Sequence, residues 1–267
     1  MPGAIDLDAY FARIGYEGPC EATLDVLRDL HLKHAQTIPF ENLSSFVGVP
    51  VPIDVPSLEK KLVQSRRGGY CFEQNALFSA VLEAMGFEVT RLAARVLWGV
   101  PEGVITGRSH MVLLIEIDGR DYVADVGFGG LTQTAPLLLD GREQSTPHEK
   151  FRIGREGDYY KIGAQAGGEW RALYRFDLTP QLPVDYTYSN YYVATNPASI
   201  FVNGLMLCRP HENGRYTLSN RVFSSYAKDG TVARRELKSA DELIAVLRDL
   251  FLIDPPPGLE KAFAGLA

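Results

Sequence analysis

The chain of 267 residues is long enough to bury a core and close a pocket, and its 46% hydrophobic and 22% charged residues are ordinary for a globular protein. Its 27 basic and 33 acidic residues give a formal net charge of -6, which argues against a nucleic acid as partner. Met1–Ala12 lacks the basic and apolar regions of a secretory signal, and the apolar runs are only strand-sized. We therefore expect a cytoplasmic protein that does not enter a membrane.

The three cysteines, Cys20, Cys71 and Cys208, are too few and odd in number for a disulfide framework. Such usage is typical of a reducing compartment, where a single well-placed thiol can act as a nucleophile. Cys20 follows a loop proline and Cys208 lies in an apolar run, so we expect both of these to be structural.

Residues 1–87 are predicted to be helical, because apolar residues recur at helical spacing. Leu24, Leu27 and Leu30, for example, share one stripe. The predicted helices cover residues 6–14, residues 23–38, a segment that Ser57 caps, and a segment from Cys71 to a terminating glycine, Gly86.

Residues 88–188 change to short apolar segments separated by turn sequences such as Asp118-Gly119. Strands at this spacing predict a small antiparallel barrel or sandwich. Residues 189–267 mix further strands with a helix that the capping-box sequence 239–242 opens. The chain is expected to be an α+β protein whose parts pack as one body, because no low-complexity linker separates them.

Cys71 follows a Gly-Gly-Tyr segment (68–70) and begins an apolar-periodic stretch. A thiol in the first turn of a helix faces unpaired N–H groups and the positive end of the helix dipole, and both favour the thiolate. Arg66 and Arg67 can add positive charge, and the same N–H groups can hold the oxyanion of a tetrahedral intermediate. The residues alone leave a second interpretation open, in which Cys71 is a buried packing thiol.

His110 and Asp125 lie on two apolar segments that flank the turn at 118–119. A two-residue loop would pair Ile117 with Arg120, and counting back from that pair places His110 and Asp125 on one face as diagonal neighbours. A buried carboxylate needs a partner, and a histidine that turns one N–H toward it keeps its other ring nitrogen for a proton from a thiol. A core pair without chemistry is the alternative.

The remaining histidines and glycines carry weaker signals. His31 and His34 are three residues apart, but no cysteine or carboxylate cluster completes a metal site, so no metal is expected. His148 and His211 lie among polar residues and are expected in solvent. The glycines of segment 127–130 lack the lysine and the helix context of a nucleotide-binding loop, and we expect a turn there.

Arg67-Gly-Gly-Tyr-Cys-Phe-Glu73, a histidine on a strand and Val123-Ala-Asp-Val-Gly-Phe-Gly129 occur in an order that resembles the arylamine N-acetyltransferase family. The short connection between the strand region (88–188) and the mixed C-terminal region (189–267) resembles that of the bacterial members of the family. The similarity spans most of residues 6–250, and further segments carry it at residues 10–16, 38–43, 94–96, 173–176 and 196–201.

The resemblance implies a helical bundle (1–87), a central antiparallel β-barrel (88–188) and an α/β lid (189–267), in a cysteine-protease-like arrangement. It implies acetyl-CoA as donor, an arylamine, arylhydrazine or arylhydroxylamine as acceptor, and a ping-pong reaction through acetyl-Cys71, with His110 moving protons and Asp125 orienting it. The resemblance also implies an aromatic pocket for the acceptor, formed by Phe40, Tyr70, Phe128 and Phe201. It further implies a CoA cleft, formed by Trp98, Ser109, Gly129 and Gly130.

Two other functions are left open by these residues. An amide synthase of a biosynthetic pathway resembles the same family but takes its acyl chain from a carrier. A cysteine hydrolase uses the same triad and releases the acyl group to water, although the phenylalanine-rich surround of Cys71 and Asp125 speaks against a cleft for a polypeptide. The expected partners are CoA and a small-molecule acceptor, and a homo-oligomer is also left open.

Overall fold

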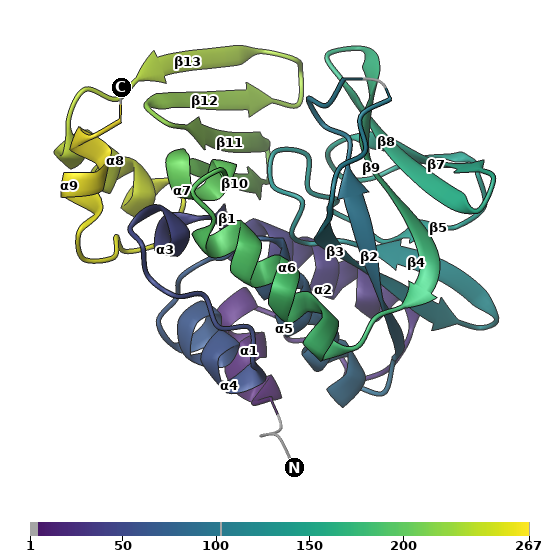
Figure 1. The fold of residues 1–267 in the computed structure, drawn as a ribbon. Helices are drawn as coiled ribbons and strands as arrows, with labels where there is room; N and C mark the ends of the chain where they lie inside the picture. Colours follow the sequence, from purple (N-terminus) through teal and green to yellow (C-terminus); the bar gives the residue numbers. More distant parts are fainter. Residues whose placement is uncertain (1–4, 102, 267) are drawn as a thin grey trace.

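The structure is a computed structural model that describes residues 5–101 and 103–266, and every statement below on elements and contacts concerns these residues. Residues 1–4, Glu102 and Ala267 belong to the predicted helical, strand and mixed regions but lie outside the described part. The described chain combines a group of helices, an eight-stranded antiparallel sheet that forms a nearly closed barrel, and a five-stranded sheet with its own helices (Figure 1). The predicted α+β class with an antiparallel barrel is confirmed.

Side-chain caps set the starts of the N-terminal helices. The carboxylate of Asp6 and the hydroxyl of Thr23 accept backbone N–H groups in the first turns of α1 (Leu7–Ile14) and α2 (Leu24–Thr37), the helices expected over residues 6–14 and 23–38. The prediction that Ser57 caps the next helix is wrong. Asp54 caps α4 (Val55–Leu58) by accepting the N–H of Ser57 at 3.0 Å, and the chain continues into the π-helix η1 (Glu59–Gln64).

The barrel sheet has the strand order β5-β4-β3-β2-β9-β8-β7-β6, and its strands pair antiparallel. Most neighbours in this order are also neighbours in the chain, so short turns connect them. The strands are β2 (Glu88–Val96), β3 (Arg108–Ile117), β4 (Arg120–Ala124), β5 (Leu137–Leu138), β6 (Glu143–Ser145), β7 (Lys150–Glu156), β8 (Tyr159–Ala166) and β9 (Glu169–Pro180).

The second sheet joins the two ends of the chain. Its order is β1-β10-β11-β12-β13, and β1 (Phe40–Glu41) pairs antiparallel with β10 (Met206–His211). The predicted strands near the C-terminus are present, whereas the β1–β10 pairing had no local sequence signal. The other elements of this part are α3 (Leu43–Phe46), α7 (Ile200–Asn203), β11 (Gly214–Ser219), β12 (Val222–Ala227), β13 (Val232–Glu236), α8 (Ala240–Asp249) and α9 (Leu259–Ala264).

Helix α6 (Pro183–Thr195) connects the barrel to the second sheet and crosses in front of the helices in Figure 1. It packs against β3 and α7. The domain limits expected after residues 87 and 188 stay a prediction, and residue 188 lies within α6.

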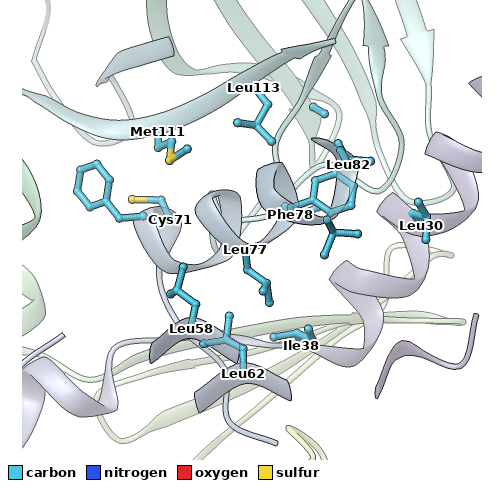
Figure 2. Close-up of a cluster of buried hydrophobic side chains, with 14 of the residues drawn as sticks. Leu30, Ile38, Leu58, Leu62, Cys71, Leu77, Phe78, Leu82, Met111 and Leu113 are labelled. Atoms are coloured by element: carbon cyan, nitrogen blue, oxygen red, sulfur yellow. The ribbon is translucent and has the colours of Figure 1, made fainter. Parts of the chain in front are cut away.

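Helix α5 (Cys71–Ala84) packs against the barrel through one continuous apolar core. Leu77 and Phe78 of this helix are fully buried in the same cluster as Met111 and Leu113 of β3. Figure 2 shows Cys71 at the start of α5 beside Met111, with Phe78 and Leu82 further along the helix. Because close-packed side chains leave little freedom for one element to slide on another, this core fixes where the Cys71 thiol lies relative to β3.

Candidate active site

Cys71 is the first residue of α5, as predicted, and its side chain is buried. Two glycines allow the approach that brings it there. A Cβ atom on Gly68 would lie 2.1 Å from the carbonyl oxygen of Pro39, and one on Gly69 would lie 2.7 Å from Oε2 of Glu73. Either position would clash with any other residue, so the chain before Cys71 requires both glycines.

Arg66 and Arg67, which precede the two glycines, do not both act as free positive charges at the thiol. The Arg67 guanidinium donates to the buried carboxylate of Glu41 at 2.6 Å, so its charge is compensated there. Arg66 is exposed and has a positive φ of 51°. The charge of Arg67 is therefore balanced by Glu41, and Arg66 lies in solvent.

His110 on β3 and Asp125 after β4 form a buried pair, with Nε2 of the imidazole 2.7 Å from Oδ2 of the carboxylate. The hairpin has the predicted two-residue loop, because Ile117 pairs with Arg120. Asp118 and the following glycine both have positive φ, which matches the mirror-image turns that connect twisted strands. The prediction that hairpin geometry brings His110 and Asp125 to one face is confirmed.

Asp125 is held by groups from three other parts of the chain. Its Oδ1 accepts hydrogen bonds from Nδ2 of Asn75 and from the backbone N–H of Gly127, each at 2.9 Å. Its own N–H donates to Nε2 of His31 at 3.3 Å. Burial raises the pKa of Asp125, but the charge and hydrogen bond of His110 and the bonds from Asn75 and Gly127 outweigh burial, so the pKa lies below its usual value.

The Cys71 thiol completes the set. Its Sγ lies 3.7 Å from the carbonyl oxygen of Ser109, the residue before His110, and the thiol is close enough to the imidazole to raise the pKa of His110. Since Nε2 of His110 faces Asp125, the nitrogen toward the thiol is Nδ1. Burial lowers the pKa of His110, but the Asp125 carboxylate and the bond to Cys71 raise it more strongly, so the pKa of the imidazole lies above its usual value.

Sequence reasoning missed two residues of this network. Asn75 also donates to the carbonyl of Met111 at 2.8 Å and accepts the N–H of Val126 at 3.0 Å, so one amide ties α5 to both barrel strands. Tyr174 of β9 places its ring 4.8 Å from the His110 ring. Asn75 had a signal, because it lies four residues after Cys71 on one helix face. Tyr174 lies in segment 173–176, which carries the family resemblance, but nothing in that segment pointed to a contact with His110.

The predicted aromatic residues form two groups beside the triad. Phe40, Tyr70 and Phe201 lie together, with ring centroids 6.0 Å apart for Phe40 and Phe201 and 5.5 Å apart for Tyr70 and Phe201. Phe128 packs edge-on against His110 at 5.5 Å. Tyr70 also hydrogen-bonds through its hydroxyl to Asn190 of α6, so its ring is fixed from that side.

The four residues predicted for the CoA cleft are spread more widely. The carbonyl of Ser109 lies beside the thiol, and Gly129, with a φ of 95°, lies under the ring of Phe40. Gly130 is exposed. Trp98 is 43% exposed, and the guanidinium of Arg171 lies 5.7 Å from its ring.

The other histidines are structural. Burial lowers the pKa of His31 to about 3 and that of His34 to about 4, so both stay neutral at neutral pH. The expectation that His148 lies in solvent is wrong: its two ring nitrogens contact the hydroxyl of Thr134 at 3.1 Å and the carbonyl of His211 at 2.8 Å. Across residues 5–101 and 103–266, no three His, Cys, Asp or Glu residues gather in a group able to hold a metal ion.

A thiol, an imidazole and a carboxylate joined in this order are the parts of a nucleophilic centre that forms covalent acyl intermediates. Their position, where a helix N-terminus meets an antiparallel barrel, is the geometry expected of an enzyme that works through a cysteine thiolate.

Comparison with known proteins gives the family. A family profile described as N-acetyltransferase matches residues 23–256. The chain is 42% identical over 247 residues to the arylamine N-acetyltransferase of Escherichia coli (strain K12), with 92% of this chain and 88% of that protein covered. It is 28% identical over 274 residues to arylamine N-acetyltransferase 1 of Homo sapiens, with 93% and 94% covered.

The fold agrees with solved structures. The Mycobacterium marinum arylamine N-acetyltransferase in complex with CoA matches with a TM-score of 0.94 at 38% identity, covering 98% of this chain and 100% of that chain. The chain belongs to the arylamine N-acetyltransferase family and is an acyltransferase. Within the described residues, no helix combines the length and the apolar character that crossing a membrane requires.

Gly127 provides a test of how closely the barrel must approach α5. A Cβ atom there would lie 2.8 Å from Cα of Cys71 and 3.1 Å from Nδ2 of Asn75, so Gly127→Ala is expected to push the helix start away from His110. The acetyl-transfer rate should fall by at least about tenfold, because small displacements of a catalytic group are costly. The matched control is Gly107→Ala, where a Cβ meets nothing within 4 Å. Equal activity in both variants, measured with thermal melts alongside, would contradict this geometry.

Proposed function

We propose that this protein transfers an acetyl group from acetyl-CoA to an arylamine, an arylhydrazine or an arylhydroxylamine through an acetyl-Cys71 intermediate. The observation that carries the proposal is the buried line from the Cys71 thiol through His110 to Asp125, in a chain of this family. The relatives are named for arylamine acetylation, and one matched structure is a complex with CoA. The cytoplasm is the proposed location, since the three cysteines are free.

The first half-reaction uses the pair of Cys71 and His110. The thiolate attacks the thioester carbonyl of acetyl-CoA, the C–S bond to CoA breaks, and the departing sulfur takes the proton from Nδ1 of His110. The carboxylate of Asp125 holds Nε2–H, keeps Nδ1 pointed at the sulfur, and stabilises the imidazolium while it exists. The products of this step are free CoA and acetyl-Cys71.

The second half-reaction restores the site. The acceptor nitrogen attacks the acetyl-Cys71 carbonyl while Nδ1 of the neutral His110 accepts its proton, and the Cys71 sulfur leaves as thiolate. An aromatic amine is a weak nucleophile, so its position matters more than its basicity. The rings of Phe40, Tyr70 and Phe201 are suited to hold a flat aromatic acceptor beside the acetylated sulfur.

The donor would approach along Ser109 and Gly129, which lie next to the thiol and the Phe40 ring. In this proposal Trp98 and Gly130 lie further out along the same path. The residues present fit a thioester at the sulfur, because the first turn of α5 provides backbone N–H groups for the developing oxyanion.

Cys71→Ser tests the intermediate directly. Incubation of the wild-type chain with acetyl-CoA alone should add one acetyl group on Cys71 in the intact mass, and an arylamine or hydrazine should then release CoA in proportion to acetylated amine. Cys71→Ser should show neither, while Cys20→Ser, which changes an exposed thiol, should behave as wild type. Continued CoA release without the amine, beyond the single turnover that acetylates Cys71, would indicate a hydrolase and overturn the proposal.

Asp125→Asn tests the orienting carboxylate. The amide cannot stabilise the imidazolium, and we expect the rate of acetyl transfer to fall by about three to four orders of magnitude. Asp121→Asn is the control, since that carboxylate lies exposed on the same hairpin. Activity of Asp125→Asn within about tenfold of wild type would show that His110 does not depend on this carboxylate.

The raised pKa of His110 predicts how thiol reactivity changes with pH. A raised pKa keeps the imidazolium beside Cys71 through neutral pH and loses it only as the pH rises through that higher value. Iodoacetamide should therefore alkylate Cys71 at about pH 6 nearly as fast as at about pH 8, and His110→Ala should be at least about tenfold slower at the lower pH. Peptide mass analysis separates Cys71 from Cys20. A steep rise in the wild-type alkylation rate between these two pH values would refute an ion pair between the Cys71 thiolate and the His110 imidazolium.

A further inference from the structure

The outer face of the barrel carries a hollow that the acetyl-transfer site does not use. It lies over β7, β8 and β9, on the right in Figure 1, and has a volume of about 480 Å³. Phe151 and Ile153 of β7 and Ile162 of β8 point into the barrel core. Their neighbours Arg152 and Gly154 therefore face outward, because side chains alternate along a strand.

Missing side chains create this hollow. Arg152 is paired with Gly163, and Gly163 is paired with Ala172, so small residues follow one another across the strands. At Gly163 the packing requires glycine, since a Cβ would lie 3.1 Å from the carbonyl oxygen of Arg171. Neither packing nor backbone conformation requires glycine at position 154, because a Cβ there would meet nothing within 4 Å and the φ of Gly154 is not positive.

Glycine inside a strand weakens the strand, and one explanation of such a position is that a ligand approaches the backbone closely. Gly154 lies directly opposite Lys161, so the open floor adjoins a positive charge. The residue choice at position 154 thus costs stability without serving the packing of the chain itself.

The walls of the hollow are strongly basic in a chain whose net charge is -6. Four basic residues and one acidic residue line it, and the four are Arg152, Arg155, Lys161 and Arg171. Lys161 pairs with Glu156 at 3.1 Å and Arg171 pairs with Glu169 at 3.6 Å. Arg152 forms no ion pair within 4.0 Å among the described residues, and Glu143, which lies opposite it in the register, pairs with Lys150.

Arg152 is also held in position. Its guanidinium stacks on the ring of Trp170, 4.5 Å from the centroid, which restrains a side chain that is otherwise flexible. Stacking uses the face of the guanidinium and leaves its N–H edge able to donate to an anion. A planar fork of this kind binds phosphate oxygens in a bidentate manner.

We propose that this hollow binds a nucleoside diphosphate, with phosphates on Arg152 and Lys161 and the flat ring over the floor at Gly154. The hollow, of about 480 Å³, has room for a ring beside the phosphates, and the backbone at Gly154 is open to that ring. The hollow lies apart from the Cys71 triad, although Arg171 of its lining also contacts Trp98, which the proposed donor path includes. The nucleotide proposal does not depend on the function proposed for Cys71.

Calorimetric titration of the full chain with ADP tests the proposal. We expect saturable 1:1 binding in wild type and binding weaker by at least about tenfold in Arg152→Gln, because a charge-assisted bidentate contact is lost. Arg120→Gln, which removes an exposed basic residue elsewhere on the barrel, should bind as wild type. Absence of ADP binding to wild type, or equal affinity in both variants, overturns the proposal.

Gly154→Val separates a binding role from a structural one. A β-branched residue suits a strand, so the melting temperature should stay equal or rise while ADP affinity falls. Unchanged affinity in a folded Gly154→Val would overturn the assignment of the floor. Inorganic pyrophosphate should bind more weakly than ADP, because it lacks the ring, and equal affinity would overturn the nucleotide class.

Steady-state kinetics with acetyl-CoA test whether the hollow binds the acetyl donor. In Arg152→Gln, kcat and KM for acetyl-CoA should stay within about twofold of wild type. The reason is that Arg152 contacts none of the three triad residues. A KM for acetyl-CoA that rises together with the loss of ADP binding would overturn the separate site and make the hollow part of the donor path.

Discussion

The buried carboxylate of Asp125 is the constraint on which the site depends. Removing one partner of a buried charge is expected to cost about 3–5 kcal/mol, so every group that satisfies this carboxylate also stabilises one arrangement of the chain. His110 comes from β3, Asn75 from α5 and the N–H of Gly127 from the loop after β4. The helices and the barrel must therefore dock in one way, and that docking also places the Cys71 thiol.

Packing around this point explains why the thiol is buried next to a cluster of aromatic rings. Tight contact at Gly127 sets the closest distance between the barrel loop and α5. On the other side, β1 ties the segment before Cys71 to the second sheet, so Phe40 meets Phe201 although the two residues are far apart in sequence. An aromatic cluster built from three separate segments can only form when all three parts are folded together.

Local signals predicted what depends on neighbouring residues. The helices over residues 6–14 and 23–38 and the two-residue hairpin loop were predicted because each depends on side chains or dihedral angles within a few positions. The cap at Ser57 was wrong because Asp54, three residues earlier, competes for the same role. His148 was expected in solvent on polarity alone, and its burial comes from contacts with Thr134 and His211, which polarity cannot reveal.

By itself the sequence determined the α+β class, the family resemblance, the face shared by His110 and Asp125, and the start of a helix at Cys71, since strand alternation and helix capping are properties of short segments. Only the tertiary structure decided that Asn75 and Tyr174 surround the same carboxylate and imidazole, that Glu41 neutralises Arg67, and that a basic hollow lies outside the barrel. These features join residues distant in the chain. Their contacts follow from how whole elements pack, which no local pattern of residues encodes.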